Sequence, residues 1–167
     1  MPPKYEIRQA TISQPDLEGI KQAHRASILE IGPTKYTPQQ ISAWGKDRPE
    51  SGYGDAIYYG EVYFVAESIK EPGFFYGVSS YKLENAQHCL KMLYVRGAYA
   101  RHGIGKELYN TVEDYALEKG AGEIFIRSSL TGKEFYLAQG SEILRQYPYE
   151  FDGIGFECID MKKALSV

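Results

Sequence analysis

The spacing of apolar residues predicts four helices along the chain. In the first, apolar positions recur every three or four residues from Leu17 to Ile31, which places them on one helical face, and Gly32 follows as a stop. The second helix covers about 37–45, the third about 103–119, and a short fourth about 131–139. Three of these helices begin with a residue pair that matches a capping box, namely Ser13 with Asp16, Thr37 with Gln40, and Thr131 with Glu134.

Runs of β-branched and aromatic residues between these helices predict strands. Only short turns separate the three central runs, so we expect them to form an antiparallel meander. Residues 46–60 are rich in glycine and predict a turn-rich connection. The order of the elements predicts a mixed sheet with helices packed on it, in one domain that spans 1–167. The predicted strands cover 5–11, 61–69, 74–83, 88–95 and 123–128, with one or two more in 143–165.

The composition is that of an ordinary globular protein and argues against several classes. The 167 residues carry 19 basic and 22 acidic side chains, a net charge of −3, whereas nucleic-acid binders normally have a basic excess. No apolar stretch is long enough to cross a membrane, and the first residues contain no hydrophobic signal region. The two cysteines, Cys89 and Cys158, provide neither a disulfide framework nor a zinc-ligand spacing. We therefore expect a cytoplasmic protein with no metal, no nucleic-acid partner and no membrane partner.

The most informative stretch for chemistry is 93–106, where a predicted strand leads into the long third helix. Gly103 and Gly105 open that helix. The first amides of a helix have no intrahelical acceptor and lie at the positive end of the helix dipole, so they attract anions. The two glycines allow a pyrophosphate to approach the backbone, and Arg101 and Lys106 add positive charge. The same glycines also fit a plain strand-to-helix turn that binds nothing.

Two other phosphate-binding loops do not match this stretch. A dinucleotide-binding fingerprint needs a third glycine at position 108, which is Leu108, and a first βαβ unit where this chain has a meander. A Walker loop needs the pattern G-x-x-x-x-G-K-S/T, which the chain lacks.

Three motifs in register resemble the GNAT superfamily of acyl-CoA-dependent N-acetyltransferases. The first joins Leu93-Tyr94-Val95 at a strand end to Arg101-His102-Gly103-Ile104-Gly105 at a helix start. The second comprises Ser129, Phe135-Tyr136 and Gly140, and the third comprises Met161, Lys163 and Leu165. Two positions depart from the family pattern, because Ala100 stands in place of the usual Arg or Gln and Ser141 in place of the usual Phe.

The resemblance implies a fold and a coenzyme. The fold is α/β (α+β), with a mixed, mostly antiparallel central sheet of six to seven strands flanked by about four helices. Acetyl-CoA would bind where the sheet splays beside strand 88–95, and Tyr136 would act as general acid toward the leaving thiolate, since a phenol is neutral at pH 7. The implied coenzyme-binding residues are Leu93, Tyr94, Val95, Arg101, His102, Gly103, Ile104, Gly105, Lys106, Ser129 and Tyr136.

The identity of a general base stays open. His88 has the most suitable unperturbed pKa but stands at the start of its strand, and Cys89 fits a small buried hydrophobe better than a nucleophile. Glu134, Glu157 and an ordered water are further candidates. Strict alternation along 88–95 places Cys89, Lys91, Leu93 and Val95 on one face, and His88, Leu90, Met92 and Tyr94 on the other.

The resemblance also implies where the acceptor binds. In the family, the first two helices and the loop between the last two strands form this pocket, which here means 30–47 and 147–156. Four aromatic residues could form a wall there, and nearby carboxylates could attract a cationic amine. His24 and Trp44 also fit ordinary helical and core positions. The expected acceptor-side residues are Tyr36, Trp44, Tyr147 and Tyr149 with the carboxylates of Glu30, Glu150 and Asp152.

The implied function is transfer of an acetyl group from acetyl-CoA to a primary amine of a small molecule or peptide, by direct attack in a ternary complex. Two alternatives are non-enzymatic: an acyl-CoA-binding regulatory or interaction module without turnover, and a plain interaction domain whose glycine loop is structural. Tyr136 favours the enzyme. The resemblance also points to the final strands as a place for pairing into a homodimer.

Overall fold

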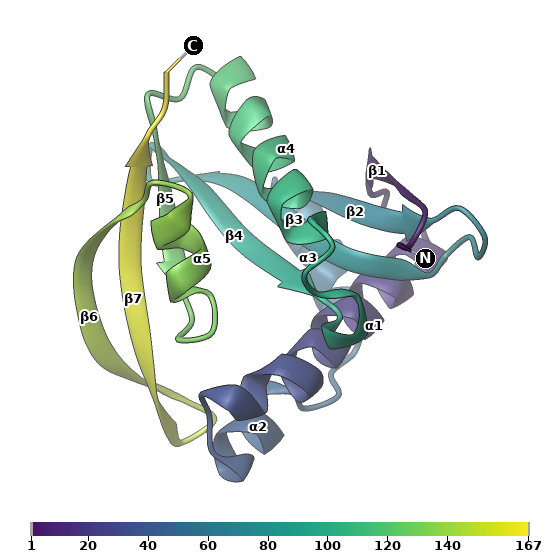
Figure 1. Ribbon diagram of the computed structural model, residues 1–167, viewed down its shortest axis with the longest axis horizontal. Coiled ribbons are helices and arrows are strands. Elements are labelled where there is room, and N and C mark those ends of the chain that lie inside the picture. The colour runs from purple at the N-terminus through teal and green to yellow at the C-terminus, as the bar shows by residue number, and fades with distance from the viewer. Residues whose placement is uncertain (1, 167) are drawn as a thin grey trace.

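A computed structural model describes residues 2–166 and shows one seven-stranded sheet with helices on both faces (Figure 1). The strand order is β1-β2-β3-β4-β5-β7-β6, and every neighbouring pair is antiparallel except β4 and β5. The predicted mixed, mostly antiparallel sheet is confirmed. The elements are β1 (Tyr5–Gln9), α1 (Gln14–Ile31), α2 (Pro38–Trp44), α3 (Ser51–Tyr58), β2 (Val62–Ser68), β3 (Phe75–Glu84), β4 (Gln87–Val95), α4 (Ile104–Glu118), β5 (Glu123–Ser128), α5 (Lys133–Ala138), β6 (Glu142–Phe151) and β7 (Ile154–Ala164), with short 3₁₀ turns at Gly32–Thr34 and Gly97–Tyr99.

The parallel pair β4–β5 is the weakest ladder of the sheet. Only Cys89 with Phe125 and Leu90 with Ile126 are paired, after which the two strands diverge (Figure 1). Within the described chain, no strand pairs with the β5-facing edge of β4 from Lys91 to Val95. The backbone N–H and C=O groups on that edge therefore face a gap in the sheet.

A β-bulge in β4 changes which of its side chains share a face. Ser80 pairs with Met92 and Tyr81 pairs with Leu90, so Lys91 is the extra residue. The strict alternation predicted from the sequence is therefore wrong across Lys91. Leu90 lies on the α4 face together with Leu93 and Val95, while Met92 and Tyr94 pack toward α1.

Each face of the sheet has its own apolar core. On one face, α4 buries Ile104, Leu108 and Val112 against the central strands, and Tyr136 of α5 joins this cluster. On the other face, α1 buries Ile20 and Ala23 against β2 and β3. The sheet is thus covered on both sides along β2–β4, and α5 lies in front of β5 in Figure 1.

Residues 46–60 are not the turn-rich connection that the sequence predicted, because they contain helix α3. Tyr53, Ala56 and Ile57 pack against the α1-side core, and this burial outweighs the poor helical propensity of the glycines. Gly54 lies close to Leu17, so the absence of a side chain lets α3 approach α1.

The three predicted capping boxes have three different outcomes. Thr37 and Gln40 form the complete reciprocal box. Ser13 accepts the Asp16 amide, but the Asp16 carboxylate turns away from the Ser13 backbone. The box predicted at Thr131 is wrong, since α5 begins after Gly132 and has no side-chain cap.

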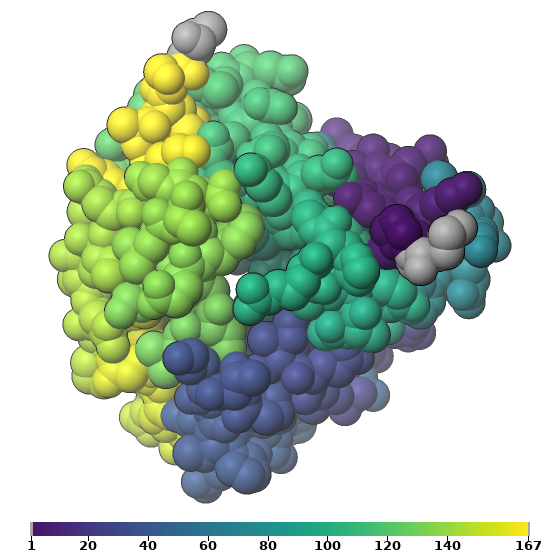
Figure 2. Space-filling model, in the orientation of Figure 1, coloured from purple at the N-terminus to yellow at the C-terminus, as the bar shows by residue number. Residues whose placement is uncertain are grey.

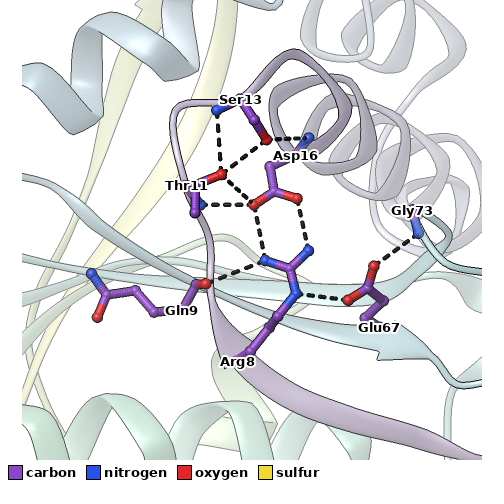
Figure 3. A network of polar contacts seen from close by, with 7 residues as sticks. All are labelled: Arg8, Gln9, Thr11, Ser13, Asp16, Glu67 and Gly73. Atoms are coloured by element: carbon purple, nitrogen blue, oxygen red, sulfur yellow. Dashed lines mark hydrogen bonds and ion pairs between the residues drawn. The ribbon is translucent and has the colours of Figure 1, made fainter.

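The Asp16 carboxylate instead binds Arg8, as Figure 3 shows. Two guanidinium nitrogens of Arg8 donate to Asp16 at 2.9 and 2.7 Å, and its Nε donates to Glu67 at 2.6 Å. This network joins β1, β2 and the start of α1. It is a structural tie and lies outside the cavities described below. None of the helices within 2–166 has the length and apolar character needed to span a bilayer.

Candidate active site

A cavity of about 170 Å³ lies where β4 and β5 diverge. We call it the β4–β5 cavity. Figure 2 shows a hollow at the centre of the molecular face, between blue atoms of the first helices, the loop before α4 and green atoms of the β5–α5 region. Its lining comes from α1, α2, β4, α4, β5 and α5, and includes Leu93, Tyr94, Val95, Gly105, Ser129 and Tyr136.

The loop before α4 forms one end of this cavity. Gly103 is the N-cap of α4 and has φ +82°, a left-handed conformation that glycine adopts without strain. The amides of Ile104, Gly105 and Lys106 belong to the first helical turn, where the helix itself offers no acceptor. Gly105 lines the cavity, and Arg101, His102 and Lys106 are exposed beside it. The loop therefore has the form of an anion site.

The end of β4 forms a side of the cavity. Leu93, Tyr94 and Val95 all line it, and their β5-facing backbone edge is unpaired among the described residues. An extended chain with amide groups could add to this edge as a strand does.

Tyr136 lies on α5 at the opposite side of the cavity. Its side chain is buried, only 5% exposed, and burial together with nearby Tyr94 raises the pKa of its hydroxyl far above the ordinary value of a tyrosine. Within residues 2–166, no group accepts a hydrogen bond from this hydroxyl. Ser129 fixes the turn before α5, because its hydroxyl accepts the Gly132 amide at 3.2 Å and contacts the Thr131 hydroxyl at 2.9 Å.

A second cavity, of about 340 Å³, lies on the α1 side of Tyr94. We call it the α1 cavity. It shares Ile28, Trp44 and Tyr94 with the β4–β5 cavity, so the two are adjacent. Its remaining lining residues come from α1, the α2–α3 connection, α3, β4 and β6: Lys21, His24, Arg25, Lys46, Arg48, Tyr53, Met92, Tyr149 and Phe151.

His24 is a largely buried titratable group in the wall of the α1 cavity. Its Nδ1 is 2.8 Å from the Tyr53 hydroxyl, and its ring lies 4.3 Å, centroid to centroid, from the Tyr94 ring. The Nε2 atom is shielded from solvent and has no partner among the described residues. Burial, with a smaller effect of Arg48, lowers the pKa of His24 to about 4. The imidazole is therefore neutral at pH 7.

Only some of the acceptor-side residues predicted from the sequence lie together at the α1 cavity. Trp44 and Tyr149 line the α1 cavity. Tyr36 is buried beneath it, with its ring 5.1 Å from Trp44 and its hydroxyl accepting the Leu130 amide at 2.8 Å. Tyr147 donates to Asp160 at 3.2 Å, outside both cavities. The Glu30 carboxylate accepts the Ala98 amide at 3.1 Å and also lies outside them.

None of the candidate bases considered from the sequence lines either cavity. His88 is 2.7 Å from the Tyr81 hydroxyl, and burial raises the pKa of the Cys89 thiol. Glu134 and Glu157 are exposed. Sequence reasoning instead missed Lys21, Arg25, Lys46, Arg48 and Tyr53. A signal existed on α1, where Lys21, His24, Arg25 and Ile28 follow helical spacing.

Between residues 2 and 166, no group of three or more His, Cys, Asp and Glu side chains is placed to hold a metal ion.

Comparisons with known proteins agree with this arrangement. The family model described as an acetyltransferase (GNAT) domain matches residues 34–165. The chain therefore belongs to the GNAT acetyltransferase family. It is 27% identical to the uncharacterized N-acetyltransferase YafP of Escherichia coli over 121 residues, which is 72% of this chain and 71% of that protein.

Two solved structures show the same fold along nearly the whole chain. A GCN5-related N-acetyltransferase of Rhodopseudomonas palustris superposes with a TM-score of 0.82 at 22% identity, covering 99% of this chain and 97% of the other. The PaiA N-acetyltransferase of Thermoplasma acidophilum, solved in complex with coenzyme A, gives 0.76 at 21% identity, with 97% and 99% covered.

Proposed function

We propose that this protein transfers an acetyl group from acetyl-CoA to a primary amine, by direct attack of the amine on the thioester while both are bound. The observation that carries this proposal is the β4–β5 cavity, which has the start of α4, with amides that lack an intrahelical acceptor, at one end and the buried phenol of Tyr136 opposite. The adjacent α1 cavity, which shares Ile28, Trp44 and Tyr94 with it, supports a place for a second substrate.

The residues present fit acetyl-CoA. The amides of Ile104, Gly105 and Lys106 would hold the pyrophosphate, with Arg101 adding charge. The free edge from Leu93 to Val95 would pair with the amides of the pantetheine arm. When bound, acetyl-CoA supplies an acetyl group activated as a thioester, which a neutral amine attacks to form an amide and the free thiol, so that one proton passes overall from the nitrogen to the sulfur.

Tyr136 would hold a proton at its Oη for the departing sulfur. Its pKa is raised, so the phenol stays protonated at neutral pH and acts as an acid and never as the resting base. Such a donor is useful only in a site shielded from water, and the burial of Tyr136 meets that condition.

The described residues suggest how the amine loses its proton without a carboxylate base. Within residues 2–166 no Asp or Glu lines either cavity, whereas four basic side chains line the α1 cavity. Positive neighbours and desolvation both lower the pKa of a bound ammonium group. The amine would therefore lose its proton to solvent before it attacks.

Two measurements on the purified protein test this proposal. Calorimetric titration with acetyl-CoA should give micromolar binding, and a thiol reagent should detect free CoA when an amine panel is added. Binding without CoA release from any amine would support the alternative of a non-catalytic acyl-CoA-binding module. Absence of binding would contradict the proposal.

A further inference from the structure

We infer that the α1 cavity selects an acceptor amine that also carries a carboxylate, such as an amino acid, joined to an apolar or aromatic body. This inference names the substrate class of the proposed function and rests on it. The expectation from the sequence was a cationic acceptor attracted by Glu30, Glu150 and Asp152, but none of these carboxylates lines the cavity.

The charge of the lining carries the inference. Its charged members are Lys21, Arg25, Lys46 and Arg48, and among the described residues no acidic side chain balances them within the cavity. Two of these cations form ion pairs with carboxylates that do not line the cavity. Lys21 pairs with Asp47 at 2.8 Å and Glu50 at 3.7 Å, and Arg48 pairs with Asp152 at 2.6 Å. Arg25 and Lys46 have no ion pair in the part of the chain that the structure describes.

Arg25 is held in place for a ligand. Its Nε donates to the Gly45 carbonyl at 2.7 Å, which fixes the guanidinium at the cavity wall. No described residue accepts from its two terminal nitrogens. A guanidinium fixed in this way offers two parallel donors, the geometry that matches a carboxylate.

A second observation points to a ligand in the same place. The His24 Nε2 is buried and without a partner among residues 2–166, although His24 lines the cavity. A buried polar atom normally has a hydrogen-bond partner, so a polar ligand group is the natural one here. The remaining wall is mostly aromatic, formed by Trp44, Tyr53, Tyr94, Tyr149 and Phe151 together with Ile28 and Met92.

The geometry also orients the acceptor. Tyr94 and Trp44 border both cavities. Arg25 and Lys46, the cations without an ion pair, line the α1 cavity, whereas Lys91 and Arg127 line the β4–β5 cavity. A carboxylate bound by Arg25 would leave the amine free to point past Tyr94 toward the β4–β5 cavity, where the acetyl group would lie. An acceptor without the carboxylate would leave Arg25 and Lys46 without a counter-charge.

Paired acceptors test the inference directly. Phenylalanine and phenethylamine differ only in the carboxylate, so kcat/KM from CoA release should be at least tenfold higher for phenylalanine. Arg25→Gln should remove about tenfold or more of that preference, because it removes a charge-assisted hydrogen bond, and Lys46→Gln a smaller part. Lys35→Gln is the matched control for Lys46→Gln, since both lysines are exposed and Lys35 lies outside the cavity.

A binding measurement separates this inference from the proposed function. N-acetylphenylalanine and N-phenethylacetamide are the corresponding products, and their calorimetric titration needs no turnover. Tighter binding of the carboxylate product, weakened in Arg25→Gln, supports the inference even if no CoA is released. Equal or weaker binding of that product, or equal turnover of both acceptors, overturns it while acetyl transfer to other amines would stand. Failure to bind acetyl-CoA overturns the proposed function.

Discussion

Tyr94 is the residue on which the two cavities meet. The bulge at Lys91 turns its ring toward α1, where it contacts His24 and lies 6.2 Å, centroid to centroid, from Trp44. Its hydroxyl is buried, and burial raises its pKa. Tyr94 therefore stays neutral and separates the two cavities, while the proton donor of the proposed function is Tyr136.

Tyr136→Phe tests that division of roles. Loss of the proton donor should lower kcat about 100-fold, a typical contribution of general acid catalysis, while the dissociation constant of acetyl-CoA changes less than about twofold. Steady-state rates and calorimetry give both values. Tyr115→Phe, away from both cavities, is the control. An unchanged kcat would show that Tyr136 donates no proton in the rate-limiting step.

The depressed pKa of His24 predicts a pH dependence of stability. Its folded pKa is about 4, against an ordinary value of 6.5, so the unfolded chain binds more protons between these two pH values. The free energy of unfolding should therefore fall as the pH decreases from 6.5 toward 4, by roughly 1 kcal/mol per pH unit in the middle of this range.

Urea unfolding at pH 6.5 and pH 5 measures this effect in the wild type and in His24→Gln. The variant should lose the His24 share of the pH slope, whereas His102→Gln, at an exposed histidine, should keep it. Identical slopes in the wild type and His24→Gln would contradict the assignment to His24.

At the scale of elements, the sequence predicted the structural features that residues close together along the chain determine. The β4-to-α4 segment is such a case, because Leu93–Val95 and the loop to Gly105 are contiguous and could be placed together. The α3 helix and the bulge at Lys91 were missed, because both depend on packing against other elements. The cationic lining was missed for the same reason, since Arg25, Lys46 and Arg48 come from different segments that only the fold brings together.

The start of α4 gives a prediction at this scale. A Cβ at Gly105 would meet Val95 at an ordinary 3.5 Å and would otherwise project into the cavity. Gly105→Ala should therefore keep or raise the free energy of unfolding by up to about 0.5 kcal/mol, yet weaken acetyl-CoA binding roughly five- to tenfold.

Gly52→Ala is the matched control, since Gly52 is likewise the second residue of its helix and has open space around it. It should affect stability in the same direction and leave acetyl-CoA binding unchanged. Equal acetyl-CoA affinities in the wild type and both variants would argue against Gly105 as part of the coenzyme site. If Gly105→Ala lowered the free energy of unfolding, its weaker binding would reflect a disturbed fold and would not show contact between Gly105 and the coenzyme.

At the scale of the molecule, the sheet has two parts that join weakly through the two residue pairs of β4 and β5. Contacts from α2 and from the connection between α2 and α3 reach the C-terminal part of the sheet and offset this weak pairing. Gln40 donates to the Gly155 carbonyl at 2.9 Å, and Arg48 pairs with Asp152 at 2.6 Å. Tyr36 contributes the buried link, through its hydroxyl to the Leu130 amide. Because these ties join the two parts of the sheet beside the cavities, we expect them to set the width of the site.

Tyr36→Phe tests the buried hydrogen bond between the Leu130 amide and the Tyr36 hydroxyl by itself. It removes the acceptor of the Leu130 amide and keeps the ring against Trp44, so unfolding should become easier by about 1–2 kcal/mol, with Tm lower by roughly 2–8 °C. Leu130 directly follows Ser129 and precedes α5, so amide exchange should rise at 129–132, and saturating acetyl-CoA should restore part of the protection by bridging β4 and α5. Tyr58→Phe, at a residue that is 78% exposed, should change neither property. Increased exchange spread over the whole chain, with no excess at 129–132, would show that Tyr36 supports the global fold and does not set the width of the site.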